Sequence, residues 1–374
     1  MKVLMINSVC GIRSTGRICT DIADRLVAEG HECKIAYGRE HVPDMFQKYA
    51  VRIGSELGNR ISAMHTRLTD QHGFANKRAT KQFLRWAEEY DPDLLWIHNI
   101  HGYYIHVQLL FDWIKSRPNM QVKWTLHDCW PFTGHCTYFT VANCEKWKTH
   151  CNNCPQTKCY PCSYLRDNCI KNFEHKKAAF TGVSNMKLIT PSQWLADLVK
   201  QSFLGEYPVE VCNNTIDLNV FKPTPGNFKE RMGIQKKKII LGVASVWDER
   251  KGLADYLNLA EMLDASYTVV LVGLSAKQQR HLPGNVIGIS RTNSTKELAE
   301  IYTAADVFVN LTYEDNYPTV NLEARACGTP IITYKTGGSP ESAGNKAIVI
   351  PQGDLPGIKE AVLQLCGEHI DCQV

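Results

Sequence analysis

A repeated alternation of short apolar runs with longer amphipathic stretches constrains the fold of this chain most. In the first half, runs of strand length cover residues 2–7, 33–37, 94–98, 122–126, 187–190 and 209–212. Helical patterns lie between several of them, at residues 15–29, 77–89, 104–116 and 193–202. Strands that alternate with helices in this way form parallel sheets covered on both faces. We therefore predict an α/β fold.

The segment NNTIDLNVFKPTPGNFKERMGI, rich in Pro, Gly and Asn, interrupts the alternation. Strand-length runs then return at residues 238–244, 267–272, 286–289, 307–309, 330–334 and 347–350, with helical patterns at 251–263, 295–304, 318–327 and 355–366. A chain of 374 residues also exceeds what one core usually serves. The sequence predicts two doubly wound, Rossmann-like domains, 1–222 and 223–374, with ligands at the carboxyl ends of the strands.

Composition excludes several classes of protein. No apolar run reaches the roughly 18 residues of a membrane-spanning helix, and the first residues lack the pattern of a signal peptide. The net charge of +4 is too small to indicate a nucleic acid partner. We expect a cytoplasmic protein.

Two turns have the composition of phosphate sites. Gly11 and Gly16 lie in a loop between a strand and a helix, where backbone amides can hold a phosphate, although a plain tight turn has the same pattern. The spacing of these glycines is not that of a dinucleotide fingerprint. Arg250 and Lys251 follow a strand and precede a helix, which suits a diphosphate; the alternative is a solvated pair of cations.

The stretch EDNYPTVNLEARACGTPIITYKTGG places acids on both sides of a predicted helix start. Glu314 and Asp315 follow a strand, the amides of Thr319 and Val320 point at the turn, and Glu323 lies about one helical turn further on. Asp315 and Glu323 can therefore hold two parts of one ligand. The alternative is a capped helix with an exposed Glu, but the neighbours of Glu323 are too apolar for an idle carboxylate. Such a Glu suits hydrogen bonds to paired hydroxyls.

This D-x7-E pattern and the A-x-A-C-G-T-P-I-I-T-Y-K-T-G-G run after it resemble the E-x7-E region of retaining glycosyltransferases of family 4, which have the GT-B fold. Residues 212–223 resemble the N-G-I-D-x-x-x-F-x-P linker of that family, residues 246–252 its diphosphate-binding segment, and residues 271–273 the strand before its base-binding loop. The stretch HDCWPFTGHC at 127–136 resembles the subgroup that builds bacterial surface polysaccharides such as colanic acid and capsules.

The resemblance implies two domains facing a central cleft, and transfer of a sugar from a nucleotide-sugar donor to a glycan acceptor. A UDP- or GDP-sugar is the expected donor, the acceptor is free or lipid-linked, configuration is retained, and catalysis needs no metal cofactor. It implies that Arg250 and Lys251 hold the donor diphosphate and stabilise its growing charge. Asp315, or Glu314 beside it, would lie near the donor sugar, and His127 would face that sugar from the N-terminal domain.

The resemblance also implies a set of donor-binding groups. Glu323 would bind the nucleotide ribose, and the amides of Thr319 and Val320 would contact phosphate. Gly11 and Gly16 would let the N-terminal loop approach the donor closely.

Two departures from the family pattern keep other functions open. Asp315 is one methylene shorter than the family's Glu, and residues 368–374 are too few for the helix that returns to the N-terminal domain in many relatives. The alternatives are a sugar epimerase of the same fold and a degenerate nucleotide-sugar-binding protein without turnover.

The chain is rich in cysteine, with eight of its 15 between Cys129 and Cys169, in an expected insertion of the N-terminal domain. C-x2-C spacing favours thiolate ligation of a tetrahedral zinc, and Cys136, Cys144, Cys151 and Cys154 form one plausible set. Cys159 and Cys162, or His127, His135 and His150, are other candidate ligands. Reduced thiols, disulfides or another metal are the alternatives. A zinc here would brace a loop rather than catalyse.

Aromatic and basic residues of the N-terminal domain form one further group, for which we expect ordinary packing, with peripheral contact to the inner face of the cell membrane as the alternative. The group consists of Trp86, Trp96, Tyr103, Tyr104, Trp113, Lys115 and Arg117.

Overall fold

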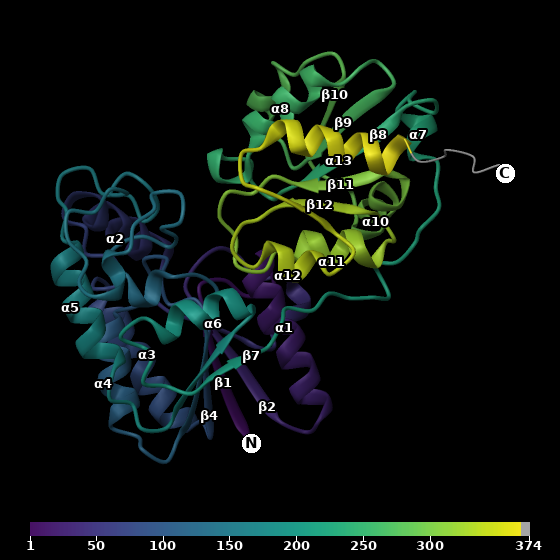
Figure 1. Cartoon of the computed structure of the whole chain (residues 1–374). Helices are drawn as coiled ribbons and strands as arrows, with labels where there is room; N and C mark the ends of the chain where they lie inside the picture. The colour runs from purple at the N-terminus through teal and green to yellow at the C-terminus, as the bar shows by residue number, and fades with distance from the viewer. Residues whose placement is uncertain (368–374) are drawn as a thin grey trace. The chain divides into compact units, whose positions relative to one another are not determined.

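The computed structural model describes residues 1–367 and divides the chain into two compact units, Met1–Asn213 and Asn214–Val374. Each unit is a parallel sheet with helices on both faces, which confirms the predicted fold class (Figure 1). The prediction that residues 368–374 are too few for a returning helix concerns residues outside the described ones. None of the described helices combines the length and the apolar character needed to cross a membrane.

The N-terminal unit contains, within the described residues, a seven-stranded sheet of order β3-β2-β1-β4-β5-β6-β7, with every pair parallel. The strands are β1 Lys2–Asn7, β2 Glu32–Tyr37, β3 Ala50–Arg52, β4 Leu94–Ile97, β5 Gln121–Thr125, β6 Met186–Thr190 and β7 Val209–Val211. The α-helices are α1 Arg13–Ala28, α2 Glu56–Thr69, α3 Lys77–Tyr90, α4 Val107–Lys115, α5 Cys169–Phe180 and α6 Gln193–Lys200, and short 3-10 turns are η1 Asp44–Phe46, η2 Trp130–Phe132 and η3 Lys146–Lys148.

The C-terminal unit contains, over the residues described, a six-stranded parallel sheet of order β10-β9-β8-β11-β12-β13. Its strands are β8 Lys238–Val243, β9 Tyr267–Val272, β10 Val286–Ile289, β11 Val307–Asn310, β12 Ile331–Tyr334 and β13 Ile348–Ile350. Its helices are α7 Phe228–Arg231, η4 Glu249–Lys251, α8 Leu253–Met262, α9 Ala276–Gln279, α10 Thr295–Ala304, α11 Thr319–Ala326, α12 Ser339–Ala343 and α13 Leu355–Gly367.

Each sheet has an apolar core on both faces, because its strands carry apolar side chains in both directions. In the C-terminal unit one core packs under α8 and α13, and the other packs under α10, α11 and α12. Figure 1 shows these two helix layers on opposite sides of the sheet. In the N-terminal unit α1 covers one face, and α3, α4 and α6 cover the other.

The aromatic group of the N-terminal domain is largely packing. Tyr104 and Trp113 are buried in the core of that unit, while Trp86 and Trp96 are half-buried against it. Arg117 lies over the ring of Trp113 and pairs with Glu88.

The segment between the two sheets belongs to the C-terminal unit. The division falls after Asn213, whereas the sequence analysis put it after residue 222. Phe221 is buried in the core beneath α10 and α11, and its ring centroid lies 6.4 Å from that of Tyr302. Apolar anchors inside a polar, Pro-rich segment therefore decide which unit the segment joins.

Phe221→Ala tests this anchoring. We expect a loss of about 3 kcal/mol in the stability of the C-terminal unit, because truncation of a buried Phe leaves a cavity. Hydrogen exchange read by mass spectrometry should show faster exchange in β8–β13 and unchanged exchange in β1–β7. Equal acceleration in both units would contradict the assignment.

Candidate functional site

The sheet of the C-terminal unit reverses its winding between β8 and β11, which are neighbours in space but not in sequence. Ligands of doubly wound sheets bind outside the carboxyl ends of the strands at such a switch point. The loop after β8 leads to Arg250 and Lys251, and the loop after β11 carries Glu314 and Asp315. The topology therefore brings the predicted cations and acids to one edge.

Direct contacts join these two loops. Lys251 Nζ lies 2.5 Å from Asp315 Oδ2, and both side chains are about four-fifths buried (21% and 18% exposed). Arg250 donates from a guanidinium nitrogen to the carbonyl of Glu314 at 3.3 Å, and its own carbonyl accepts from the Tyr313 amide at 2.7 Å. Because Asp315 already neutralises Lys251, an anion bound here competes with Asp315 for the ammonium group.

Two glycines allow the backbones of these loops to lie in close contact. Gly252 has a φ of +69°, and a Cβ on it would lie 2.2 Å from the carbonyl oxygen of Leu311. Gly337 has a φ of +52°, and a Cβ there would lie 1.9 Å from the carbonyl oxygen of Asp315. Any side chain at either position would push the loops apart. Within the stretch EDNYPTVNLEARACGTPIITYKTGG, the backbone around Asp315 thus requires a glycine at position 337.

Helix α11 begins at Thr319, so the amides of Thr319 and Val320 belong to its first turn, where backbone N–H groups have no intrahelical acceptor. Glu323 is half-buried, and its Oε2 accepts a hydrogen bond of 2.9 Å from the hydroxyl of Tyr302. Burial raises the pKa of Tyr302 well above its ordinary value, and the charge of Glu323 raises it further, so this hydroxyl stays a donor. The structure therefore supplies a positioning partner for Glu323.

A buried polar network holds α11 and α12 against the end of β11. The Asn321 side chain donates to the backbone oxygen and hydroxyl of Ser339 and to the hydroxyl of Ser342. The Asn310 amide donates to Asn321 Oδ1 at 2.8 Å. Buried amides with several partners fix orientation strongly. Sequence reasoning missed this network and Tyr302, because the partners lie on separate elements.

In the N-terminal unit, histidines follow β4 and β5 at the carboxyl edge of the sheet. His98 Nδ1 lies 3.0 Å from His127 Nε2, and the two rings stack with an interplanar angle of 19°. His101 Nε2 lies 2.8 Å from Asp128 Oδ2, and its Nδ1 lies 3.1 Å from the hydroxyl of Tyr160. Of these residues sequence reasoning identified only His127. His98 carries the same signal, since it directly follows a buried strand.

Burial sets the charge of these groups. It lowers the pKa of His127 to about 4, and it lowers the pKa of His98 well below the ordinary value, with His127 adding to the effect. Burial alone would raise the pKa of Asp128, but the charge and hydrogen bond of His101 and the Trp130 amide hold it below its usual range. At neutral pH the site thus presents uncharged imidazoles at 98 and 127 and an ionised carboxylate at 128.

Gly11 and Gly16 have structural reasons to be glycine. Gly11 has a φ of +73°, and a Cβ on it would lie 2.4 Å from the Phe46 ring. A Cβ on Gly16 would lie 3.1 Å from Val9 and 3.2 Å from the Gly11 nitrogen, so the start of α1 packs directly on the loop. These contacts leave their predicted role toward the donor untested.

The Cys-rich segment, residues 129–169, is tied down by polar contacts. The His135 ring lies 2.5 Å from Asp70 at the end of α2, and both side chains are fully buried. The buried Lys176 Nζ donates to the carbonyls of Trp130 and Thr133. These contacts hold a segment with little regular structure.

The four thiols of the predicted zinc set line one small cavity in this segment, together with Cys169. The Cys136 and Cys154 sulfurs share a hydrogen bond, and the Cys151 sulfur accepts from the Gly134 amide at 3.2 Å. The 14 described cysteines are all free thiols. Nowhere in residues 1–367 are three or more His, Cys, Asp or Glu placed to hold a metal ion, so structural zinc stays a prediction from the sequence.

Metal analysis tests the zinc prediction. We expect about one zinc per chain after purification, because C-x2-C thiolates bind zinc tightly. Cys151→Ser should reduce this content, whereas Cys212→Ser, an exposed cysteine outside the segment, should not. Zinc-free protein in which every thiol titrates would establish the reduced-thiol alternative instead.

His127→Gln tests the neutral imidazole. The unfolded chain binds a proton near pH 6.5 that the native chain binds only near pH 4, so His127 lowers stability as the pH falls through this window. At pH 5 this contribution is about 2 kcal/mol, and above pH 6.5 it vanishes. The measurement is Tm against pH for the parent and the variant. The variant should lose less stability on acidification, while the exposed control His41→Gln should follow the parent.

Known proteins resemble parts of this chain or all of it. Residues 237–368 match the family model described as glycosyl transferases group 1. The chain is 25% identical over 380 residues to WcaC of Escherichia coli (strain K12), a protein named for glycosyl transfer in colanic acid biosynthesis. The aligned region covers 98% of this chain and 89% of WcaC.

Solved structures share the fold of the whole chain. Sucrose-phosphate synthase from Thermosynechococcus elongatus superposes with a TM-score of 0.69 at 16% identity, covering 98% of this chain and 90% of that one. HepE of Anabaena, in complex with UDP and glucose, superposes with a TM-score of 0.64 at 14% identity, covering 99% and 90%. The C-terminal unit therefore matches the group 1 glycosyl transferases over residues 237–368, and the two parallel-sheet units share the GT-B fold of these structures.

Proposed function

We propose that the chain transfers a sugar from a nucleotide-sugar donor to a glycan acceptor, with retention of configuration, in the synthesis of a bacterial surface polysaccharide. The observation that carries the proposal is the joined pair of loops at the edge of the C-terminal sheet, where Arg250 and Lys251 meet Glu314 and Asp315. The likeness to WcaC supports the polysaccharide, and the UDP complex of HepE supports the donor class.

In this proposal the bond between the sugar's anomeric carbon and the diphosphate oxygen breaks, and the electron pair stays on the diphosphate. An acceptor hydroxyl oxygen forms the new bond to the anomeric carbon, and its proton passes to the departing diphosphate. Arg250 and Lys251 stabilise that growing charge, which lowers the barrier without a metal cofactor. Lys251 exchanges its contact with Asp315 for the phosphate, and the freed Asp315 carboxylate can accept hydrogen bonds from sugar hydroxyls.

The remaining residues bind and orient the donor. Glu323, held by Tyr302, accepts hydrogen bonds from the ribose hydroxyls, and the amides of Thr319 and Val320 donate to phosphate. His127 is uncharged at neutral pH and contacts the donor sugar through hydrogen bonds. A lipid-linked acceptor would bring the chain to the inner face of the cell membrane, where we expect it to act.

The donor site is tested by thermal shift against UDP-, GDP-, ADP- and TDP-sugars. A ligand that binds only the folded chain stabilises it by about 2.7 kcal/mol at a hundred times its Kd. We expect one nucleotide class to raise Tm, and Lys251→Ala to abolish the rise because it removes a phosphate contact. Lys296→Ala, an exposed lysine of the same unit, is the matched control and should keep it.

An absence of any shift at millimolar donor, or an equal shift in Lys251→Ala, would contradict the proposed site. Once the donor class is known, nucleotide release should depend on an added acceptor. NMR of the product's anomeric proton then compares its configuration with that of the donor, and an inverted product would overturn the retaining reaction.

A further inference from the structure

Helix α2 has the reverse of the usual pattern of a helix on a globular protein. Its buried side chains are the small, polar Asn59, Ser62 and Thr66. Its large apolar side chains point outward: Leu57, Ile61, Met64 and Leu68 are 68%, 55%, 58% and 45% exposed. A helix that packs only against its own unit usually buries its apolar face, so the outward side of α2 is a candidate interaction surface.

These four apolar residues form a continuous band, which we call the α2 stripe. Their spacing of four, three and four residues, at about 100° per residue, places them within a sector of roughly 60°. The buried Asn59, Ser62 and Thr66 lie on the opposite side of the helix. Hydrogen bonds hold α2 in place. The side chain of Asn59 donates to the carbonyl of Gly38 at 2.5 Å, and the Ser55 side chain caps the first turn.

The stripe continues into the Cys-rich segment at the C-terminal end of α2. Tyr164 and Leu165 are 68% and 71% exposed, and the Tyr164 amide donates to the carbonyl of Arg67 at 2.8 Å. The same loop carries Tyr160, whose hydroxyl contacts His101 of the candidate site. The apolar surface therefore leads toward the histidine cluster of its own unit.

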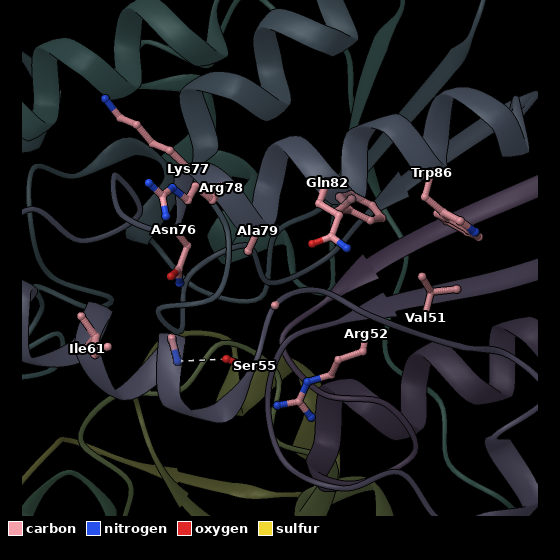
Figure 2. A pocket seen from close by; sticks show the side chains of 13 residues that line it. Val51, Arg52, Ser55, Ile61, Asn76, Lys77, Arg78, Ala79, Gln82 and Trp86 are labelled. Carbon is pink, nitrogen blue, oxygen red and sulfur yellow. Dashed lines mark hydrogen bonds between the residues drawn. The ribbon is translucent and has the colours of Figure 1, made fainter.

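Basic residues border this surface. Arg60 and Arg67 lie along one side of the stripe, and at the N-terminal end Ile61 also lines a pocket of about 950 Å³. Figure 2 shows Arg52 on one side of that pocket and Lys77 and Arg78, from the start of α3, on the other. Arg166 is exposed beside Leu165, while the exposed acids on these segments are Glu56, which pairs with Arg52, and Asp167.

We propose that the α2 stripe and its basic border are a docking surface for an anionic lipid bilayer. Apolar side chains flanked by Arg and Lys match the two layers that a bilayer presents, acyl chains below and anionic headgroups above. A second copy of this chain is a poorer occupant, because it would bring the same cations against one another. The surface differs from the aromatic group named from the sequence, which packs mostly inside the unit.

This docking deepens the membrane location in the proposed function. Its test uses neither donor nor acceptor, so its failure is distinguishable from a failure of sugar transfer. Flotation with vesicles of phosphatidylcholine containing about 30% phosphatidylglycerol measures binding, with pure phosphatidylcholine beside it. We expect the parent chain to float with the anionic vesicles, more weakly as salt rises, because screening removes the attraction of the basic border. The combined change Leu57→Gln, Ile61→Gln, Met64→Gln and Leu68→Gln should weaken binding at least tenfold.

Two further variants keep the test decisive. Arg60→Gln with Arg67→Gln should reduce binding to anionic vesicles several-fold while leaving the apolar stripe intact. Val27→Gln, Met45→Gln and Leu218→Gln, exposed apolar residues elsewhere, form the matched control and should bind as the parent does. Circular dichroism and Tm check that each variant is folded.

Three results would overturn the proposal: a parent chain that does not float with anionic vesicles, equal binding by the folded four-residue variant, or equal binding to neutral and anionic vesicles. Light scattering tests whether a second copy of this chain occupies the stripe instead. If the parent is a dimer that the four-residue variant dissociates, the stripe is an interface between copies rather than a lipid surface.

Discussion

The contact between Lys251 and Asp315 depends on two backbones that approach each other without side chains between them. Gly252 rests on the carbonyl of Leu311, and Gly337 rests on the carbonyl of Asp315 itself. The loops after β8, β11 and β12 are therefore locked together at one edge of the sheet, and the charges they carry have a fixed geometry. Preorganised charge is what a departing diphosphate needs, because the protein then does not reorganise during the reaction.

Much of the fold was readable from the sequence, and the reasons are physical. Strands buried on both faces read as apolar runs, so each strand of the C-terminal sheet was predicted within one residue at either end. Helix α2 was missed because its apolar residues face outward and its inner face is polar. Strand β3 was missed because it has three residues, and α7, α9 and α12 because they have four or five.

The candidate site was predictable only where its residues are close in sequence. Arg250, Lys251, Asp315 and Glu323 lie in motifs that a local pattern can identify. Tyr302 lies 21 residues before Glu323, on another helix, and no local pattern connects them. The pairing of His98 with His127 likewise arises only when β4 and β5 become neighbours in the sheet.

The two sheet edges have opposite electrostatic characters. The edge of the C-terminal unit holds the ion pair of Lys251 and Asp315, a contact that the proposed function exchanges for an anionic ligand. The edge of the N-terminal unit holds the imidazoles of His98 and His127, which stay neutral at physiological pH, and His101 holds the Asp128 carboxylate there. Neutral, orientated donors and acceptors suit hydroxyl groups, whereas cations suit phosphate. The proposed sugar transfer uses both environments, because the bond that it breaks joins a polyhydroxylated ring to a diphosphate, and in this chain each environment lies in a different unit.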